Sequence, residues 1–516
     1  MKSRLEVESG INNCLLISDS HISDLTSLSK HALGFLEQQL ANQKMNRVLI
    51  VSDIEGDELV CEMFYQNLQK VLCGGSIDEV ILLGSELVAQ KQRFNIAKKH
   101  CFVSTEQFLQ SDIIQNFNNQ AILLKIAPEF QPQKIRMFLQ LLPQDTVLEI
   151  DFDAMFHNIN YFRSKLKSDT KLMCMVKASA YGSGSVEVAL AMQHYGCNYL
   201  GVAFANEGVE LRQSGIKIPI MVLNPMESAL HHLFEYRLEP EICNFRMLKL
   251  ISDFAKNIGV KNYPVHIKID TGMHRAGFEK QDIAALTDFF KNQNELKIAS
   301  VFSHLASADE DTPEMNDFTL EQIALFKEIT TIFEKSINYK FIRHILNSAG
   351  IERFSDYQFD MVRLGIGLWG ISSINNKNDF NNSQSLKNVC SLSTKIIQIK
   401  KVKAGETVGY NRKGRVVQDK EIALLPLGYA DGINRKFGNG AGYMLINNKK
   451  SYIIGNICMD LLMLDVTGFN AKEGDKVVVF NSKRPFSEIA AQLETIPYEI
   501  LTAISPRVRR VYFTES

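Results

Sequence analysis

The chain has 516 residues, which is too long for a single hydrophobic core and predicts roughly three folding units. Its 45% hydrophobic and 22% charged residues, with a mean hydropathy of −0.08, are typical of a soluble protein. The 57 Lys and Arg nearly cancel the 58 Asp and Glu, so the charge balance favours neither a nucleic acid nor an anionic membrane as a partner.

The nine cysteines are scattered, without a C-x-x-C pair or a zinc-binding spacing. Such a set is typical of reduced thiols in the cytosol, and we expect no metal. The stretch Met1–Cys14 is charged and lacks the apolar segment of a secretory signal. Apolar runs such as Pro219–Asn224 have the length of a strand and are too short to cross a bilayer. We therefore expect a cytoplasmic protein without a membrane span.

The first part of the chain alternates short β-type runs with helical patterns, which predicts a small, Rossmann-like α/β domain over residues 1–145. The expected helices are Leu25–Gln43 and Glu58–Cys73. Pro and polar residues near Pro143–Thr146 mark its end. The expected strands are Cys14–Ser18, Arg47–Ser52, Glu79–Ser85 and Ala121–Lys125.

Residues 146–386 repeat a strand followed by an amphipathic helix eight times, which is typical of a (β/α)8 TIM barrel. An open doubly wound sheet is the alternative, and the first strand after residue 145 could instead join the C-terminal domain. The expected barrel strands are Lys171–Lys177, Tyr199–Phe204, Pro219–Leu223, Leu238–Cys243, Pro264–Asp270, Ile298–His304, Phe341–Asn347 and Met361–Leu368.

Helical patterns largely end at Lys387, and the β-type runs that follow predict an antiparallel β-domain over residues 387–516. Its β-type runs are VCSLSTKIIQIKKV (389–402), EIALLPLGYA (421–430), YMLINNKKSYIIG (443–455), LLMLDV (461–466) and DKVVVF (475–480). The fold class expected for the whole chain is therefore α/β, with a small α/β domain, a barrel and a β-domain in that order.

Polar residues interrupt the apolar barrel strands near their C-terminal ends, where side chains of a TIM barrel face its active site. A single lysine at such a position is usually a solvated cap, but five strands that bring polar groups to one mouth favour a functional site. These residues are Lys177, Lys268, Asp270, His304, Asn347, Ser348, Arg363 and Gly365.

The types of these residues indicate a cofactor chemistry. Lys177 leaves an apolar strand, and partial desolvation favours the neutral amine that forms a Schiff base with an aldehyde. Arg275 offers a planar fork that suits a carboxylate. Ser348 and the amides near Gly365 and Ile366 follow strands seven and eight, where this fold commonly binds phosphate. Together they predict pyridoxal 5'-phosphate (PLP) acting on an amino acid.

Nine motifs over about 370 residues resemble those of alanine racemases, and they follow in that family's order. They are MVKASAYGSG (Met175–Gly184), KIDTGMHRAGF (Lys268–Phe278), SHLASAD (Ser303–Asp309), NSAG (Asn347–Gly350), RLGIGLWG (Arg363–Gly370), VGYNRKG (Val408–Gly414), GYADGINR (Gly428–Arg435), GNICMDLLMLDV (Gly455–Val466) and PYEILTAISPRVRR (Pro497–Arg510). The resemblance implies a PLP-dependent racemase that interconverts L- and D-alanine in the cytoplasm and supplies D-alanine for peptidoglycan of the cell wall.

The resemblance also implies two catalytic bases, since a planar carbanion must lose a proton from one face and regain it on the other. Lys177, which would hold PLP, is one base, and Tyr410 is the other. The family supplies this tyrosine from the partner subunit, so a homodimer with shared sites is expected. The remaining implied roles are cofactor binding for Tyr181, His304, Ser348, Arg363, Gly365, Ile366 and Tyr498, substrate-carboxylate binding for Arg275 and Met459, and a narrow entrance for Tyr429 and Asp460. Lys268 stands at a position that is often carbamylated in the family.

Five positions depart from the family pattern. Ser179 and Ser183 stand where Asp or Asn and His are usual, Leu364 replaces a common proline, Trp369 a common tyrosine and His274 a common glycine. These departures leave serine or a broader set of amino acids as alternative substrates. A PLP-carrier module and a scaffold for cell-wall assembly remain the alternatives outside this enzyme class.

The first 145 residues resemble the C-terminal domain of the Mur ligase that adds D-Ala-D-Ala, which some bacteria fuse to alanine racemase. The likeness lies in Arg4–Gln39 and Arg47–Gly56, although the family's DSYN segment reads DSHI (Asp19–Ile22) here. No G-x-x-x-x-G-K-[ST] loop occurs in the chain, so we expect no ATP hydrolysis by it. A docking role toward cell-wall synthesis partners is the expectation for this domain.

Overall fold

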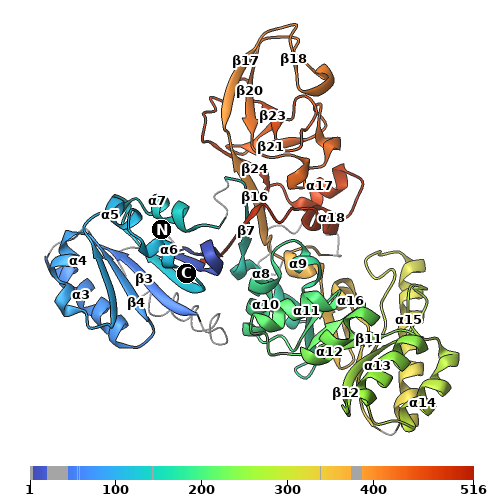
Figure 1. Ribbon diagram of the computed structural model, residues 1–516. Helices are drawn as coiled ribbons and strands as arrows, with labels where there is room; N and C mark the ends of the chain where they lie inside the picture. The colour runs from blue at the N-terminus through green and yellow to red at the C-terminus, as the bar shows by residue number, and fades with distance from the viewer. Residues whose placement is uncertain are drawn as a thin grey trace. The chain divides into compact units, whose positions relative to one another are not determined.

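The computed structural model describes residues 4–19, 45–54, 56, 58–141, 145–337, 339–372 and 386–515. The chain forms two compact units, which are described separately (Figure 1). The barrel unit comprises Ala154–Val389 and Ile496–Thr502, and the sheet unit comprises Met1–Asp153, Cys390–Thr495 and Ala503–Ser516. The helix expected over Leu25–Gln43, and all but the first residue of the DSHI segment, lie outside the described residues.

Eight parallel strands form the ring of the barrel unit, in the order β14-β13-β12-β11-β10-β9-β8-β15. Backbone hydrogen bonds from Asp360 to Arg343 (3.1 Å) and from Arg363 to Leu346 (3.0 Å) close the ring between β14 and β15. The predicted TIM barrel is confirmed, and the open doubly wound sheet is excluded. The strands are β8 (Lys171–Met175), β9 (Tyr199–Val202), β10 (Ile220–Val222), β11 (Glu239–Ile242), β12 (Tyr263–Lys268), β13 (Leu296–Phe302), β14 (Ile342–His344) and β15 (Met361–Leu364).

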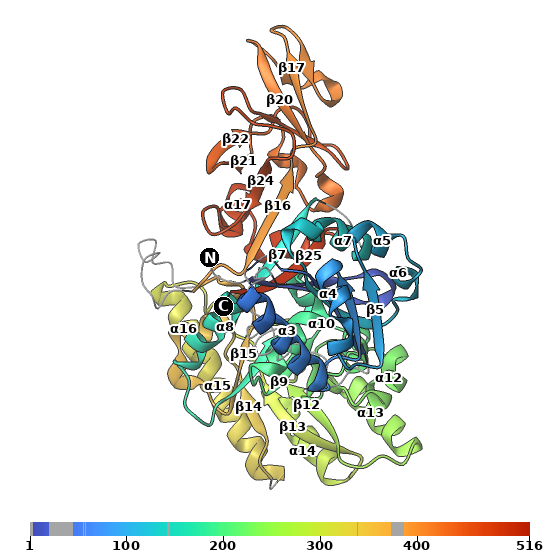
Figure 2. The same ribbon diagram turned by 90° about the vertical axis from the view of Figure 1, so that its left-hand side faces the viewer.

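The helices of the barrel unit lie outside the ring of strands (Figure 2). In α13 the side chain of Asn244 caps the first turn, and Leu248, Ile251 and Ala255 recur on the buried face with the spacing of an amphipathic helix. The helices are α8 (Phe152–Arg163, which begins in the sheet unit), α9 (Lys177–Tyr181), α10 (Ser185–His194), α11 (Ala205–Gln213), α12 (Leu230–Glu235), α13 (Phe245–Asn257), α14 (Ile283–Lys291), α15 (Pro313–Ile337), α16 (Ser348–Arg353) and α18 (Pro497–Thr502).

The sheet unit is built on twelve strands in the order β22-β21-β24-β16-β7-β25-β1-β2-β6-β3-β4-β5. They are β1 (Arg4–Ser9), β2 (Leu15–Asp19), β3 (Asn46–Ser52), β4 (Glu79–Leu83), β5 (Lys98–Phe102), β6 (Gln120–Lys125), β7 (Val147–Asp151), β16 (Cys390–Lys395), β21 (Tyr443–Ile446), β22 (Lys449–Tyr452), β24 (Lys476–Phe480) and β25 (Arg509–Glu515). A three-stranded sheet contains β17 (Gln398–Val402), β20 (Lys420–Leu425) and β23 (Leu462–Asp465). A two-stranded sheet contains β18 (Thr407–Val408) and β19 (Gly414–Arg415).

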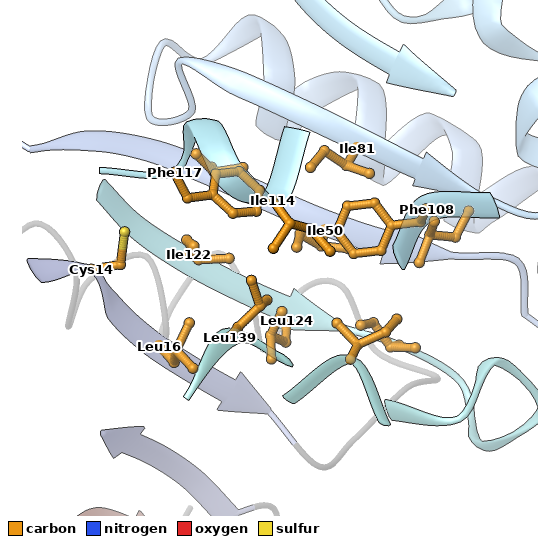
Figure 3. Packing of buried hydrophobic residues seen from close by; sticks show 14 residues of the cluster. Cys14, Leu16, Ile50, Ile81, Phe108, Ile114, Phe117, Ile122, Leu124 and Leu139 are labelled. Carbon is orange, nitrogen blue, oxygen red and sulfur yellow. The ribbon is translucent and has the colours of Figure 1, made fainter. Parts of the chain in front are cut away.

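The N-terminal part of the sheet has parallel strands, as predicted, and buries alternate residues against helices. Ile50, Ile81 and Ile122 on the strands meet Phe108 and Leu139 on the helices (Figure 3). The sequence analysis did not predict β1 or the edge strand β5. The sequence of β5, KKHCF, lacks the apolar run that would have indicated a strand. The helices of the sheet unit are α3 (Glu58–Cys73, as predicted), α4 (Ser85–Ala89), α5 (Thr105–Leu109), α6 (Ile113–Asn116), α7 (Pro132–Leu139) and α17 (Phe486–Gln492).

The C-terminal strands pair antiparallel with one another, as predicted. Strand β7 pairs with β16 on one side and β25 on the other, and β25 pairs with β1. One sheet therefore joins strands from both ends of the sequence, which the expectation of three successive units did not include. No helix in the described part of the chain combines the length and apolar composition that a bilayer crossing requires.

Candidate active site

The barrel places the predicted polar residues at the C-terminal ends of its strands. Lys177 follows β8, Lys268 ends β12, and His304 follows β13. Ser348 begins α16 after β14, and Arg363 lies within β15. Because the strands are parallel, these residues belong to one mouth of the barrel, where this fold builds its sites.

The backbone after Lys177 is a left-handed turn. The four residues Ala178–Tyr181 have φ between 49° and 56°, a conformation that costs roughly 1–2 kcal/mol for each L-residue. Glu207 fixes the turn, because its Oε1 accepts a hydrogen bond from the Ala178 amide at 2.6 Å while its Oε2 accepts one from Ala203 at the same distance. Gly182 ends the turn at φ 82°, and a Cβ there would lie 2.3 Å from the Leu501 carbonyl oxygen. The position of Lys177 is thus over-determined by its neighbours.

The amine of Lys177 lies in an environment that disfavours its charge. Partial burial lowers the pKa of Lys177, and the cations Arg275 and Lys268 lower it further. The carboxylates Glu207 and Glu241 act in the opposite direction, but the net shift of the pKa is downward. The structure therefore provides the partly desolvated lysine expected from the sequence, with an enlarged share of the nucleophilic neutral amine.

An anion cradle lies beside this turn. The Ser348 hydroxyl oxygen accepts hydrogen bonds from the amides of Gly365 (2.9 Å) and Gly367 (3.3 Å). A Cβ on Gly365 would lie 2.9 Å from the Tyr181 hydroxyl, and the rings of Tyr181 and Tyr498 have centroids 5.8 Å apart. Burial raises the pKa of Tyr181 above its usual range, so its hydroxyl remains a donor. The predicted residues Tyr181, Ser348, Gly365 and Tyr498 are thus together, and Ile366 follows Gly365 in the chain.

Arg363 is a buried guanidinium that several acceptors hold in place. It donates to the carbonyl oxygens of Ser303 (2.6 Å) and Ile345 (3.0 Å) and to the Nδ1 atoms of His344 (2.7 Å) and His304 (3.3 Å). Burial lowers the pKa of Arg363 to about 10. Burial and then Arg363 lower the pKa of His304 well below its usual range, so this imidazole is neutral. The structure thus joins His304 and Arg363 by a hydrogen bond.

A chain of hydrogen bonds continues from Arg363 into the barrel and was missed by the sequence reading. Because arginine only donates, His344 accepts at Nδ1 and donates from Nε2 to Ser300 (2.9 Å). Ser300 then donates to Nδ1 of His266 (2.6 Å), whose Nε2 donates to Glu239 (2.9 Å). The sequence did contain a signal for this chain of hydrogen bonds. His266, Ser300 and His344 are polar residues within largely apolar strands, at positions whose side chains point into the barrel.

The loop after β12 carries the expected carboxylate-binding arginine. Asp270 Oδ1 accepts from the amides of Gly272 (2.9 Å) and His274 (3.1 Å) and shapes the loop. Arg275 is exposed and forms no ion pair with any described residue, while Lys268 is paired with Glu241 (3.1 Å). In the described part of the chain, no three His, Cys, Asp or Glu side chains gather as a metal site requires.

The other predicted site residues belong to the sheet unit. Tyr410 is 67% exposed, and its carbonyl oxygen accepts from the Asn456 side chain at 3.1 Å. The loop of Tyr429 is joined to Cys458 and Met459 by backbone hydrogen bonds of 3.1 and 3.0 Å. Asp460 forms an ion pair with Arg507 at 2.8 Å. The structure thus groups Tyr410, Tyr429, Met459 and Asp460 in neighbouring loops of this unit.

Two family profiles match the chain. The profile described as "Alanine racemase, N-terminal domain" matches residues 150–373, and "Alanine racemase, C-terminal domain" matches residues 389–512. The chain belongs to the alanine racemase family. As the resemblance of its motifs indicated, it is an amino-acid racemase.

Relatives and solved structures agree with this membership of the alanine racemase family. The alanine racemase of Fusobacterium nucleatum is 37% identical over 71% of this chain and 99% of its own length, and that of Halothermothrix orenii is 35% identical over 72% and 97%. The structure of the Bacillus anthracis alanine racemase with bound L-Ala-P is 30% identical, with a TM-score of 0.65 over 72% of this chain and 95% of its own. The structure of the Bartonella henselae alanine racemase with covalently bound pyridoxal phosphate is 27% identical, with a TM-score of 0.64 over 72% of this chain and 100% of its own.

Proposed function

We propose that this protein interconverts L- and D-alanine with PLP bound covalently to Lys177. The observation that carries the proposal is the juxtaposition, at one barrel mouth, of a lysine with a lowered pKa and an anion cradle at Ser348. The structures of relatives with pyridoxal phosphate and with L-Ala-P support it. When bound, PLP supplies an electron sink that weakens the bond between the substrate Cα and its hydrogen.

The residues present fit this cofactor. Ser348 and the amides of Gly365 and Gly367 converge, as a phosphate group requires, and Gly365 leaves the room that a Cβ would fill. Tyr181 and Tyr498 complete this end. Arg363 would face the pyridine nitrogen with a donor that cannot readily give up its proton. The ring nitrogen would then stay unprotonated. This would make the ring a weaker electron sink and would favour racemisation over side reactions such as transamination.

Two groups would move the proton. Lys177 would remove or return the Cα proton on one face, and Tyr410 would act on the other. Tyr410 is 67% exposed, which suits a side chain that completes the site of a second copy of this chain. We therefore propose a homodimer with shared sites. The positive charges around His304, which belong to Arg363, Arg275 and Lys268, would stabilise the anionic form of this tyrosine.

Substrate recognition would rest on the backbone of Met459 and on Arg275, whose exposed guanidinium suits a carboxylate and forms no ion pair with the residues that the structure describes. Tyr429 and Asp460 would narrow the entrance. The residues at the entrance would determine whether the enzyme prefers alanine, serine or a broader set of amino acids. Substrate preference must therefore be measured separately from activity.

The deciding experiment is a conversion panel of L-amino acids, with chiral analysis of the products. We expect D-alanine as the main product and a visible absorbance from the cofactor bound to lysine. Lys177→Ala should abolish both, whereas the exposed Lys256→Ala on α13 should change neither. A purified wild-type protein that binds PLP but racemises no amino acid would contradict the proposal and favour a carrier module.

Tyr410→Phe tests the second base. The variant should keep the cofactor absorbance and lose roughly 10²–10⁴-fold in turnover, the usual effect of removing a general base. Measurement of kcat in both directions, together with the mass in solution by light scattering, checks the base and the dimer. Normal turnover in Tyr410→Phe, or a fully active monomer, would refute the shared-site assignment.

We further propose a cytoplasmic role in supplying D-alanine for peptidoglycan, with the first 145 residues acting as a ligase-like docking domain that is inactive alone. The motif likeness to the Mur ligase and the missing ATP-binding loop support this. Incubation with ATP, UDP-MurNAc-tripeptide and D-Ala-D-Ala should give neither ligation nor ADP. Formation of the ligated product by this polypeptide would overturn the inactive assignment.

A further inference from the structure

Helix α15 places a buried glutamine against the loops that follow β12 and β13. Gln322 is 1% exposed and lies on the buried face of this helix with apolar residues such as Phe326 and Phe333. Burial of an amide is costly unless its oxygen and its N–H groups are hydrogen-bonded. The partners of the Gln322 amide therefore show what this side chain does in the fold.

The amide of Gln322 contacts both loops. Its Oε1 atom accepts a hydrogen bond from the Ala306 backbone amide at 3.0 Å. Its Nε2 atom donates to the His304 carbonyl oxygen at 3.2 Å and to the Thr271 hydroxyl at 3.4 Å. A flipped amide would place a donor against the Ala306 N–H and an acceptor against the His304 carbonyl, so these partners fix its orientation. One side chain of α15 thus holds the backbone around His304 and reaches the loop after β12.

Thr271 joins the two loops directly. Its hydroxyl oxygen lies 2.8 Å from that of Ser303, and both side chains are buried. Because the Thr271 hydroxyl accepts from Gln322, its own hydrogen is available to Ser303. The Ser303 carbonyl oxygen in turn accepts from Arg363 at 2.6 Å. Gln322 and Thr271 therefore connect α15 to the residue that holds the buried guanidinium.

The loop that carries Arg275 is closed at its base by backbone hydrogen bonds. The Asp270 amide donates to the Phe278 carbonyl oxygen at 2.9 Å, and the Phe278 amide donates to the Lys268 carbonyl oxygen at 2.8 Å. Thr271 is the first residue above this base. A displacement of Thr271 is therefore expected to shift the loop and with it Arg275.

We propose that Gln322 is a positioning residue that sets the spacing between the loop of Arg275 and the loop of His304, with Thr271 as the link between them. This inference rests on the proposed function, in which Arg275 binds the substrate carboxylate and the positive charges around His304 stabilise the second base. Gln322 acts through the hydrogen bonds that it makes to these loops.

The cofactor end of the site provides an internal comparison. Lys177 follows β8 and Ser348 follows β14, whereas the partners of Gln322 follow β12 and β13. Displacement of the two loops should therefore weaken substrate binding and leave PLP attached. General damage to the fold would weaken both.

The first test is hydrogen exchange in the peptide that contains Ala306, measured by mass spectrometry on the PLP-loaded protein. Gln322→Leu keeps a buried side chain of similar size but removes the acceptor of the Ala306 amide, so exchange there should be roughly 5-fold faster or more. Gln213→Leu, at an exposed glutamine of α11, is the matched control and should leave the peptide unchanged. Unchanged exchange in Gln322→Leu would overturn the proposal, and this readout does not require turnover.

The second test changes the link and leaves the Gln322–Ala306 hydrogen bond in place. Thr271→Val has the shape of threonine without its hydroxyl, so KM for L-alanine should rise roughly 10-fold with a smaller change in kcat. The visible absorbance of the bound cofactor and its rate of dissociation should not change. Thr271→Ser restores the hydroxyl and should have a KM near that of the wild type. A wild-type KM in Thr271→Val, or loss of cofactor in parallel with the change in KM, would contradict the positioning role.

The double variant Gln322→Leu/Thr271→Val tests whether the two residues act through one link. Its loss in kcat/KM should be smaller than the product of the two single losses, because a link that is already broken cannot be broken again. Independent effects would refute the proposal. Failure of the proposed function is a different result: the wild type would then racemise no alanine, while the exchange of the Ala306 peptide would still be measured.

Discussion

The charge state of Lys177 depends on its burial and on charged side chains from several parts of the barrel unit, and this predicts how cofactor attachment varies with pH. Because burial, Arg275 and Lys268 lower this pKa, the neutral amine should be abundant at a lower pH than for a free lysine near ~10.4. The rate at which the apoprotein attaches PLP should rise with pH, with a midpoint below that value. Absorbance after mixing from about pH 6 to about pH 10 measures it.

The same titration has a matched variant. Arg275→Leu removes a neighbouring positive charge, so the midpoint should move upward, toward the value of an ordinary lysine. Lys256→Ala on α13 should leave it in place. A wild-type midpoint at or above that of free lysine, or a downward shift in Arg275→Leu, would contradict this account of the charges.

Two of the departures from the family pattern explain each other. Trp369 stands where tyrosine is common and Ser183 where histidine is common, and the Trp369 indole Nε1 donates to the Ser183 hydroxyl at 2.9 Å. Both side chains are fully buried, where an indole N–H needs an acceptor. A third departure, His274, has φ 52°, which is a conformation that glycine adopts more easily. The serine hydroxyl of the one departure therefore supplies the acceptor that the buried indole of the other requires.

The left-handed turn after Lys177 stores backbone strain that can be measured. Ser179 is exposed at φ 53°, so Ser179→Gly should raise the free energy of unfolding by up to about 1 kcal/mol. Ser336→Gly in the right-handed helix α15 is the control and should lower it by about 0.5–1 kcal/mol. Denaturant unfolding of both variants distinguishes strain from a general effect of glycine, and equal changes in the two would argue against strain.

The twelve-stranded sheet makes strands from the two ends of the sequence depend on each other. Glu8 on β1 is 1% exposed and forms ion pairs with Arg136 on α7 and Arg509 on β25, the latter at 3.3 Å, while Gln140 donates to it at 2.9 Å. Residues from both ends of the sequence thus share one buried carboxylate. The N-terminal segment is consequently part of the packing of the racemase's last strand.

This dependence predicts a large effect of one substitution. Glu8→Gln removes the anionic partner of the partly buried Arg509 and one of the two partners of Arg136, which keeps its pair with Glu6, so it should lower the free energy of unfolding by about 3 kcal/mol. Glu62→Gln removes an exposed pair with Arg93 and should change stability little. Thermal and denaturant unfolding with probes in both halves of the sheet would show whether Glu8→Gln weakens β25. A stability equal to that of Glu62→Gln would refute the shared role of Glu8.

The barrel and most of its strands could be predicted from the sequence alone, and so could the positions of Lys177, Arg275, Ser348 and Arg363 at or near strand ends. This was possible because period-two apolar runs are local, and because a cofactor and a carboxylate substrate restrict the residue types at strand ends.

The partners of the buried side chains of Glu241, His344 and Glu8 became known only from the tertiary structure. Each is polar in a buried place and is stabilised by a partner far away in the sequence: Lys268 on the next strand, Arg363 across the ring closure, and Arg509 near the other end of the chain. A buried charge is tolerated only where the fold supplies its counter-charge, and that pairing depends on strand order, which local sequence does not encode.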